Sequence, residues 1–177
     1  MPELSRRRHL KLAVSATFLA TFGVFPVGPR HAQARPNTGA NQQMSTTQRM
    51  QAVNPVEINI PNISQAMLVK GGDLLFLSGH LPLRSDGTIA GPTLEDQLEQ
   101  VFLNLKTTLG AAGAGFSNVA RITIYVRNLD AADLPIIRAV RDRHIDVTRP
   151  PASALIGVAE LYDPNVRVEI DAIAAVS

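Results

Sequence analysis

The clearest pattern of apolar and polar positions in the chain is helical. Its apolar residues, spaced three or four apart, are Leu98, Val101, Phe102, Leu105 and Leu109. Thr93 precedes them with Asp96 three residues later, which is typical of a helix N-cap, and Gly113 stands where a helix commonly ends. A second helix is predicted from Leu134, capped by Asp133 and ending before residue 149.

Alternating and β-branched segments around these helices predict six strands. They span residues 56–60, 66–70, 74–78, 119–126, 153–159 and 166–172. Gly71-Gly72-Asp73, between the second and third, is a hairpin signal because glycine adopts positive φ without strain. The order β-β-β-α-β-α-β-β predicts an α+β fold, a mixed sheet with two helices on one face.

The second face of this sheet has no helix to cover it. By alternation it carries mixed side chains, at Thr123, Tyr125, Arg127, Arg167 and Glu169. We expect this face to meet sister subunits, with a ligand site in the cleft between them.

The first 53 residues lie outside this domain pattern. Residues 5–11 read SRRRHLK, which resembles the twin-arginine export motif, and an apolar run and the small-x-small triplet Ala32-Gln33-Ala34 follow. We expect residues 1–34 to be a cleaved signal peptide, residues 35–53 a flexible linker and residues 54–177 the domain. The alternative, an uncleaved membrane anchor, is disfavoured because the apolar run is short and contains Pro26. The expected location is the periplasm or the exterior, without stable membrane anchoring.

Export changes the charge of the protein. Removing the five basic residues and one acidic residue of positions 1–34 leaves 12 Lys and Arg against 14 Asp and Glu, a net charge of −2. This balance argues against a general nucleic-acid partner. The absence of cysteine excludes disulfides and thiolate sites, and His80 and His144 alone are too few for a metal site, so no metal or cofactor is expected.

Several segments resemble successive blocks of one known family. They are Ile63-Ser64-Gln65-Ala66, Leu77-Ser78-Gly79-His80-Leu81-Pro82, the helix from Gln97 to Gly113, Val119 to Val126, Pro151-Ala152-Ser153 and Val168 to Ala174. In this order and spacing the chain resembles the Rid (reactive intermediate deaminase) family over residues 55–177. The resemblance implies a six-stranded mixed sheet backed by two helices, a homotrimer with ligand clefts between subunits, and hydrolysis of small enamines and imines without a cofactor.

The resemblance also implies the site residues. Glu169 occupies the position of the family's water-activating glutamate, and Ser78, beside Gly79, that of the pocket serine. Ser153 stands where deaminating members have the arginine that binds the substrate carboxylate. Two more substrate-binding positions also differ, Ile63 where many members have tyrosine and Leu155 where some have cysteine.

Alternatives stay open at these positions. Glu169 is either functional or a structural partner of Arg167 or Arg127. Arg138 either replaces the family arginine that is absent at position 153 or belongs to a solvated helix face. Another alternative is an RNA-binding patch made of Arg138, Arg141, Arg143 and Arg149, which export to a compartment without RNA disfavours. Two functions follow: a deaminase with altered substrate choice, and a catalytically silent protein that binds a small molecule on the same scaffold.

Overall fold

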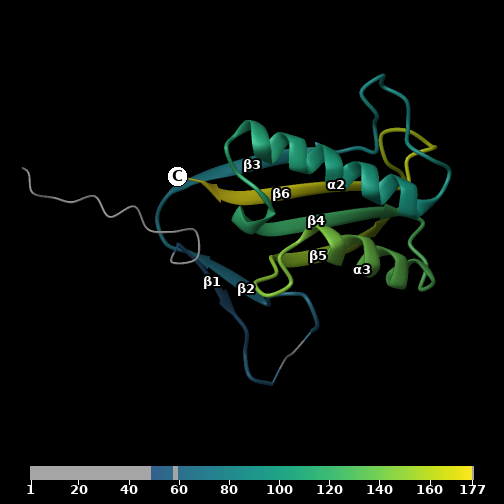
Figure 1. The fold of residues 1–177 in the computed structure, drawn as a ribbon. Coiled ribbons are helices and arrows are strands. Elements are labelled where there is room, and N and C mark those ends of the chain that lie inside the picture. The colour runs from purple at the N-terminus through teal and green to yellow at the C-terminus, as the bar shows by residue number, and fades with distance from the viewer. Residues whose placement is uncertain (1–48, 58–59, 177) are drawn as a thin grey trace, which may run out of the picture. The chain divides into compact units, whose positions relative to one another are not determined.

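A computed structural model describes residues 49–57 and 60–176 (Figure 1). The expected signal peptide and most of the expected linker lie outside these residues. The described elements are β1 (Met50–Val53), β2 (Ala66–Val69), β3 (Asp73–His80), α2 (Leu94–Ala111), the 3₁₀ turn η1 (Phe116–Asn118), β4 (Val119–Arg127), α3 (Asp133–His144), β5 (Ala152–Val158) and β6 (Val168–Val176). The α+β prediction is confirmed. None of the described helices has the length and apolar character that crossing a membrane requires.

The strands form two sheets instead of the single one expected. Four of them make a mixed sheet in the order β3-β6-β4-β5, in which β6 runs antiparallel to both neighbours and β4 is parallel to β5. β1 and β2 make a separate antiparallel pair. Both helices lie on the same side of the four-stranded sheet (Figure 1).

Helix α2 forms where the apolar spacing predicts it. The Thr93 hydroxyl caps it, accepting a hydrogen bond of 3.1 Å from the Asp96 N–H, and Gly113 follows its end with a φ of +67°. Its apolar stripe packs on the sheet together with side chains of α3, and Leu98, Phe102 and Leu105 are fully buried. A side chain of this size contributes roughly 1.5–3 kcal/mol when it is buried.

The first strand is not where the sequence pattern places it. Residues 54–57 form no strand, whereas Met50–Val53, expected to be linker, form β1. Met50 is 1% exposed and packs with Ala120 and Ala175, distant in the chain. That tertiary contact, rather than a local pattern, makes this segment a strand.

The start of α3 also differs by one residue. The helix begins at Asp133, after Ala132 as N-cap, so Asp133 is its first residue and not its cap. The Asp133 carboxylate instead accepts a 3.0 Å hydrogen bond from the Asp130 N–H in the preceding turn.

Candidate functional site

Glu169 lies on the sheet face opposite the helices, as its alternation predicts. It pairs with Tyr125 across β6 and β4, between the buried residues Val168 and Ile170 that face the core. On the same face the Tyr125 hydroxyl donates a 3.0 Å hydrogen bond to Asp171, and this bond raises the pKa of Tyr125. Glu169 therefore occupies a polar stretch of the uncovered face.

A β-bulge brings the backbone of the neighbouring strand close to Glu169. The register of β3 against β6 shifts between Leu77 and His80, at Ser78 and Gly79. A Cβ atom at position 79 would overlap the Glu169 carboxyl group, so the carboxylate lies directly over this glycine. The structure thus brings three of the expected site residues together: Glu169, Gly79 and, beside it, Ser78.

His80 holds this bulge to helix α2. One ring nitrogen, Nδ1, is 2.7 Å from the Ser78 carbonyl oxygen, and the other, Nε2, is 2.7 Å from the Thr108 hydroxyl. Because a carbonyl oxygen only accepts, Nδ1 carries the proton. The contact with Thr108 was not predictable from the sequence, since these residues lie in different elements 28 positions apart.

The Glu169 carboxylate is not used in a structural ion pair. Arg167 instead donates to Asp133 at 3.0 Å, and Arg127 donates through Nε to the Val166 carbonyl at 3.0 Å. Within residues 49–57 and 60–176, no side chain or backbone N–H donates to the Glu169 carboxylate. In one chain Glu169 therefore pairs with neither arginine, and its partly buried carboxylate has its lone pairs available.

The remaining expected residues do not meet Glu169 within one chain. Ser153 pairs with Ile122, whose side chain faces the helices, so Ser153 belongs to the opposite sheet face. β5 also lies two strands from β6, about 10 Å away. A bridge between Ser64 and Ala152 brings Ile63 close to the start of β5, and Leu155 is exposed further along this edge strand. Ile63, Ser153 and Leu155 thus form a second group at the other edge of the sheet.

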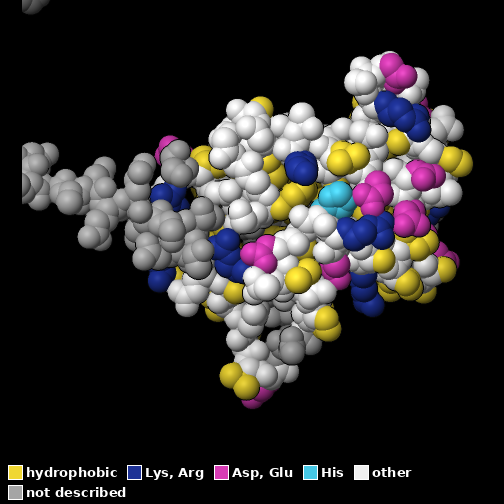
Figure 2. All heavy atoms as spheres, in the orientation of Figure 1, with side chains coloured by type: hydrophobic (Ala, Val, Ile, Leu, Met, Phe, Trp, Pro, Cys, Tyr) yellow, Lys and Arg dark blue, Asp and Glu magenta, His cyan; other side chains and the backbone are white. Residues whose placement is uncertain are grey.

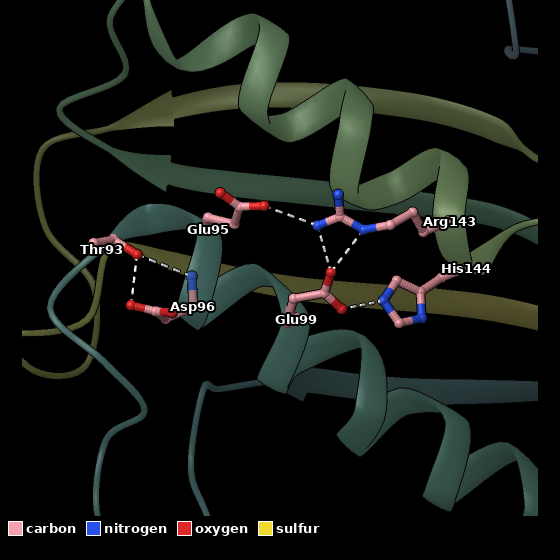
Figure 3. A network of polar contacts seen from close by, with 6 residues as sticks. All are labelled: Thr93, Glu95, Asp96, Glu99, Arg143 and His144. Carbon is pink, nitrogen blue, oxygen red and sulfur yellow. Dashed lines mark hydrogen bonds and ion pairs between the residues drawn. The ribbon is translucent and has the colours of Figure 1, made fainter.

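The basic residues of α3 do not form a free patch. Arg141 is buried against Asp142 at 2.7 Å, and Arg143 binds Glu95 at 3.0 Å and Glu99 (Figure 3). Arg138 is exposed on this helix, on the side of the sheet away from Glu169. In Figure 2 basic and acidic side chains are interspersed over the helix-bearing face. These pairings weigh against RNA binding here and leave Arg138 unconnected to the Glu169 site within one chain.

Two grooves among the described residues lie away from Glu169. One, of about 630 Å³, runs beside α2 and includes His80, and another, of about 730 Å³, includes Arg127 and Arg167. Neither is lined by Glu169 or Ser153. Nowhere in the described part of the chain do three His, Asp or Glu side chains gather closely enough to hold a metal ion.

Comparison with known proteins agrees with this fold. Residues 57–176 match the family model described as endoribonuclease L-PSP. A 2-iminobutanoate/2-iminopropanoate deaminase of Dermatophagoides farinae is 36% identical over 115 residues, covering 64% of this chain and 84% of that protein. The chloroplastic Reactive Intermediate Deaminase A of Arabidopsis thaliana is 35% identical over 107 residues, covering 60% of this chain and 55% of that protein.

Solved structures give the same result. YyfB from Yersinia pestis, a Rid-family protein of unknown function, superposes with a TM-score of 0.66 at 29% identity, covering 72% of this chain and 99% of that one. RidA from Psychrobacter sp. PAMC 21119 superposes with a TM-score of 0.54 at 28% identity, covering 67% and 92%.

Proposed function

Since the chain belongs to the endoribonuclease L-PSP (Rid) family, we propose that it hydrolyses small reactive enamines and imines without a cofactor, with a substrate choice changed by Ser153. The observation that carries this proposal is the Glu169 carboxylate, which lies over Gly79 on an uncovered sheet face with no partner in the described residues. A carboxylate in this state is free to orient and deprotonate a water molecule.

The proposed reaction uses Glu169 as general base and then as general acid. Glu169 takes a proton from water as the water oxygen bonds to the C=N carbon, and it gives this proton to the nitrogen, which leaves an amino alcohol. Glu169 then takes the hydroxyl proton and passes it to the nitrogen as the carbon–nitrogen bond breaks, so ammonia leaves and a carbonyl remains. An enamine substrate first gains a proton at carbon and loses one from nitrogen to become the imine. Ser78, exposed beside the bulge, offers a hydroxyl for hydrogen bonding to the substrate.

We propose that a neighbouring subunit completes the site in a homotrimer. Glu169 and Ser153 lie on opposite sheet faces of one chain, so a shared pocket requires Ser153 of one subunit and Glu169 of another. The uncovered face also exposes large apolar side chains, Phe76 at 70% and Leu74 at 50%, which favours burial against another copy. Sedimentation showing a monomer at micromolar concentration would contradict this assembly.

The serine at position 153 determines which substrates are expected. A hydroxyl offers a neutral hydrogen bond where an arginine would offer a bidentate, charge-assisted pair, and a neutral bond is about half as strong. Carboxylate-bearing imines should therefore be bound and oriented poorly, and smaller or neutral imines handled better. The Dermatophagoides relative is named a 2-iminobutanoate/2-iminopropanoate deaminase, so 2-imino acids are the reference substrates.

The test is ammonia release from 2-aminoacrylate and from imines produced by an amino-acid oxidase. We expect slow release by the wild type, faster release by Ser153→Arg, and loss of that gain when Glu169→Ala is added. A wild type as fast as an arginine-bearing relative would show that another cation, such as Arg138 of a neighbouring subunit, binds the carboxylate.

The second candidate function is a silent binding protein on the same scaffold. It is favoured by the joint replacement at Ile63 and Ser153, the residues that precede and follow the bridged pair Ser64 and Ala152. A Ser153→Arg variant that forms the trimer but releases no ammonia would support it, as would a small molecule that copurifies with the native protein. For either function we propose that residues 1–34 direct export and are then removed.

A further inference from the structure

A groove of about 730 Å³ lies between the loop after β3 and the loop before β6. Figure 1 shows these loops side by side at one end of the sheet. Arg127 and Arg167 line the groove, and the rest of its wall comes from neutral residues of positions 87–92 and 164–165. Among the described residues that line it there is no Asp or Glu.

The two arginines are neighbours on paired strands. The Arg127 N–H donates to the Arg167 carbonyl at 2.9 Å, which continues the β4–β6 ladder by one residue beyond the Val126–Val168 pair. Like charges at opposed positions of a sheet repel each other. Asp133 balances one charge, because it accepts from Arg167 Nη2 at 3.0 Å. The other positive charge faces the groove without a carboxylate in contact.

Both guanidinium groups also have unused donors. Arg127 donates through Nε to Val166, and within the described chain its two terminal nitrogens have no acceptor. The Nε of Arg167 is buried and has no hydrogen-bonding partner there either. Buried donors without an acceptor are uncommon in folded proteins and call for a specific explanation.

We propose that this groove binds a small oxyanion, the carboxylate or phosphate group of a metabolite, at a site separate from Glu169. Guanidinium groups match the geometry of both oxyanions and bind them through paired hydrogen bonds. An anion held between Arg127 and Arg167 supplies acceptors to the terminal nitrogens of Arg127 and relieves the repulsion across the strands. Neither Glu169 nor Gly79 lines the groove, so the proposal does not depend on the deaminase reaction.

The test is a titration of the full assembly with inorganic phosphate and, separately, with pyruvate at low ionic strength, followed by ¹H–¹⁵N spectroscopy. We expect saturable shifts at the backbone amides of Gly87, Gly91 and Asn165 with at least one ion. Arg127→Gln should raise the Kd about tenfold, since a charge-assisted bond is lost. Lys106→Gln is the control, because it removes one positive charge from an exposed position on α2 and should change the Kd less than about twofold.

Two results would overturn the proposal. One is the absence of saturable shifts at these amides with either ion. The other is an equal weakening by Arg127→Gln and Lys106→Gln, which would show a general charge effect. If Arg127→Gln does not fold, Arg127→Lys is used instead, because lysine keeps the charge but lacks the paired donors of a guanidinium group. An unchanged Kd in Arg127→Lys would overturn binding by a guanidinium pair.

Discussion

Replacing Glu99 by Gln should loosen the contact between the two helices. The Glu99 carboxylate accepts from Arg143 Nε at 2.8 Å and Nη2 at 2.5 Å, and its other oxygen lies 2.6 Å from His144 Nε2 (Figure 3). His144 stacks on Phe102, with ring centroids 4.8 Å apart. One carboxylate thus connects α2 to two residues of α3.

The size of the effect follows from the exposure of the partners. The Glu99 and Arg143 side chains are 35% and 48% exposed, so water and salt screen most of the electrostatic attraction between them. His144 is only 14% exposed, and its hydrogen bond to the carboxylate carries most of the contribution. We estimate a loss of about 1 kcal/mol in the free energy of unfolding for Glu99→Gln. Glu95→Gln is the matched control and should cost less than half of this, because Glu95 is 57% exposed and bonds Arg143 alone.

The effect should also depend on pH. Burial by itself raises the pKa of Glu99, but the hydrogen bonds from His144 and Arg143 outweigh it, so the pKa lies below its ordinary value of 4.5. A carboxyl group whose pKa is lowered by folding stabilises the protein above its unfolded-state pKa, and this stabilisation is lost as the pH falls through the folded-state pKa. The difference between wild type and Glu99→Gln should therefore be full at neutral pH and shrink as the pH drops below 4.5.

Urea unfolding of the three proteins at several pH values measures both effects. A change of about 1 kcal/mol moves the midpoint by roughly 0.5 M urea. Equal midpoints for Glu99→Gln and Glu95→Gln at neutral pH would refute the reasoning, as would a difference that persists undiminished in acid.

Three other variants test other parts of the protein. Gly79→Ala should displace the Glu169 carboxylate and lower ammonia release about tenfold or more, measured with the best imine substrate found, while the melting temperature changes little. Met50→Ala should cost about 2–3 kcal/mol in thermal unfolding, because Met50 is 1% exposed. Replacing Arg6 and Arg7 by Lys should leave the precursor in the cytoplasm on fractionation.

Each of these has a control or a contrary outcome. Gly115→Ala adds a methyl group where no atom lies within 4 Å and should leave ammonia release unchanged. Val53→Ala, at a residue 44% exposed on the same strand as Met50, should cost far less stability. Mature protein outside the cells that carry the double Lys variant would show that the export signal has been misread.

Local patterns predicted most of the fold. Helix α2 was predictable because its apolar spacing, its Thr93 cap and its terminal Gly113 agree with one another. β1 was not, since four residues carry too little pattern and its burial depends on Ala120 and Ala175. The division into two sheets was not predictable either. Alternation of apolar and polar residues shows which side chains share a sheet face, but it does not show which strands pair.

The site was predictable to the same extent. Alternation placed Glu169 on the uncovered face, but not over Gly79, since that contact depends on a bulge in another strand. The separation of Ser153 from Glu169 follows from strand order and parallel pairing, which are set by tertiary packing. For the same reason the sequence did not show that Asp133, rather than Glu169, pairs with Arg167.

The central position of β6 in the sheet has a consequence for how the protein is made. β6 follows the other described strands in the sequence, yet it pairs with β3 on one side and β4 on the other, and those two strands do not pair with each other. On the ribosome, both neighbours and both helices emerge before the strand that joins them. The sheet therefore closes only after residues 168–176 have left the exit tunnel, through contacts of high sequence separation that form slowly. Until then the apolar faces of α2 and β4 are exposed, so a nascent chain that still lacks β6 depends most on chaperones.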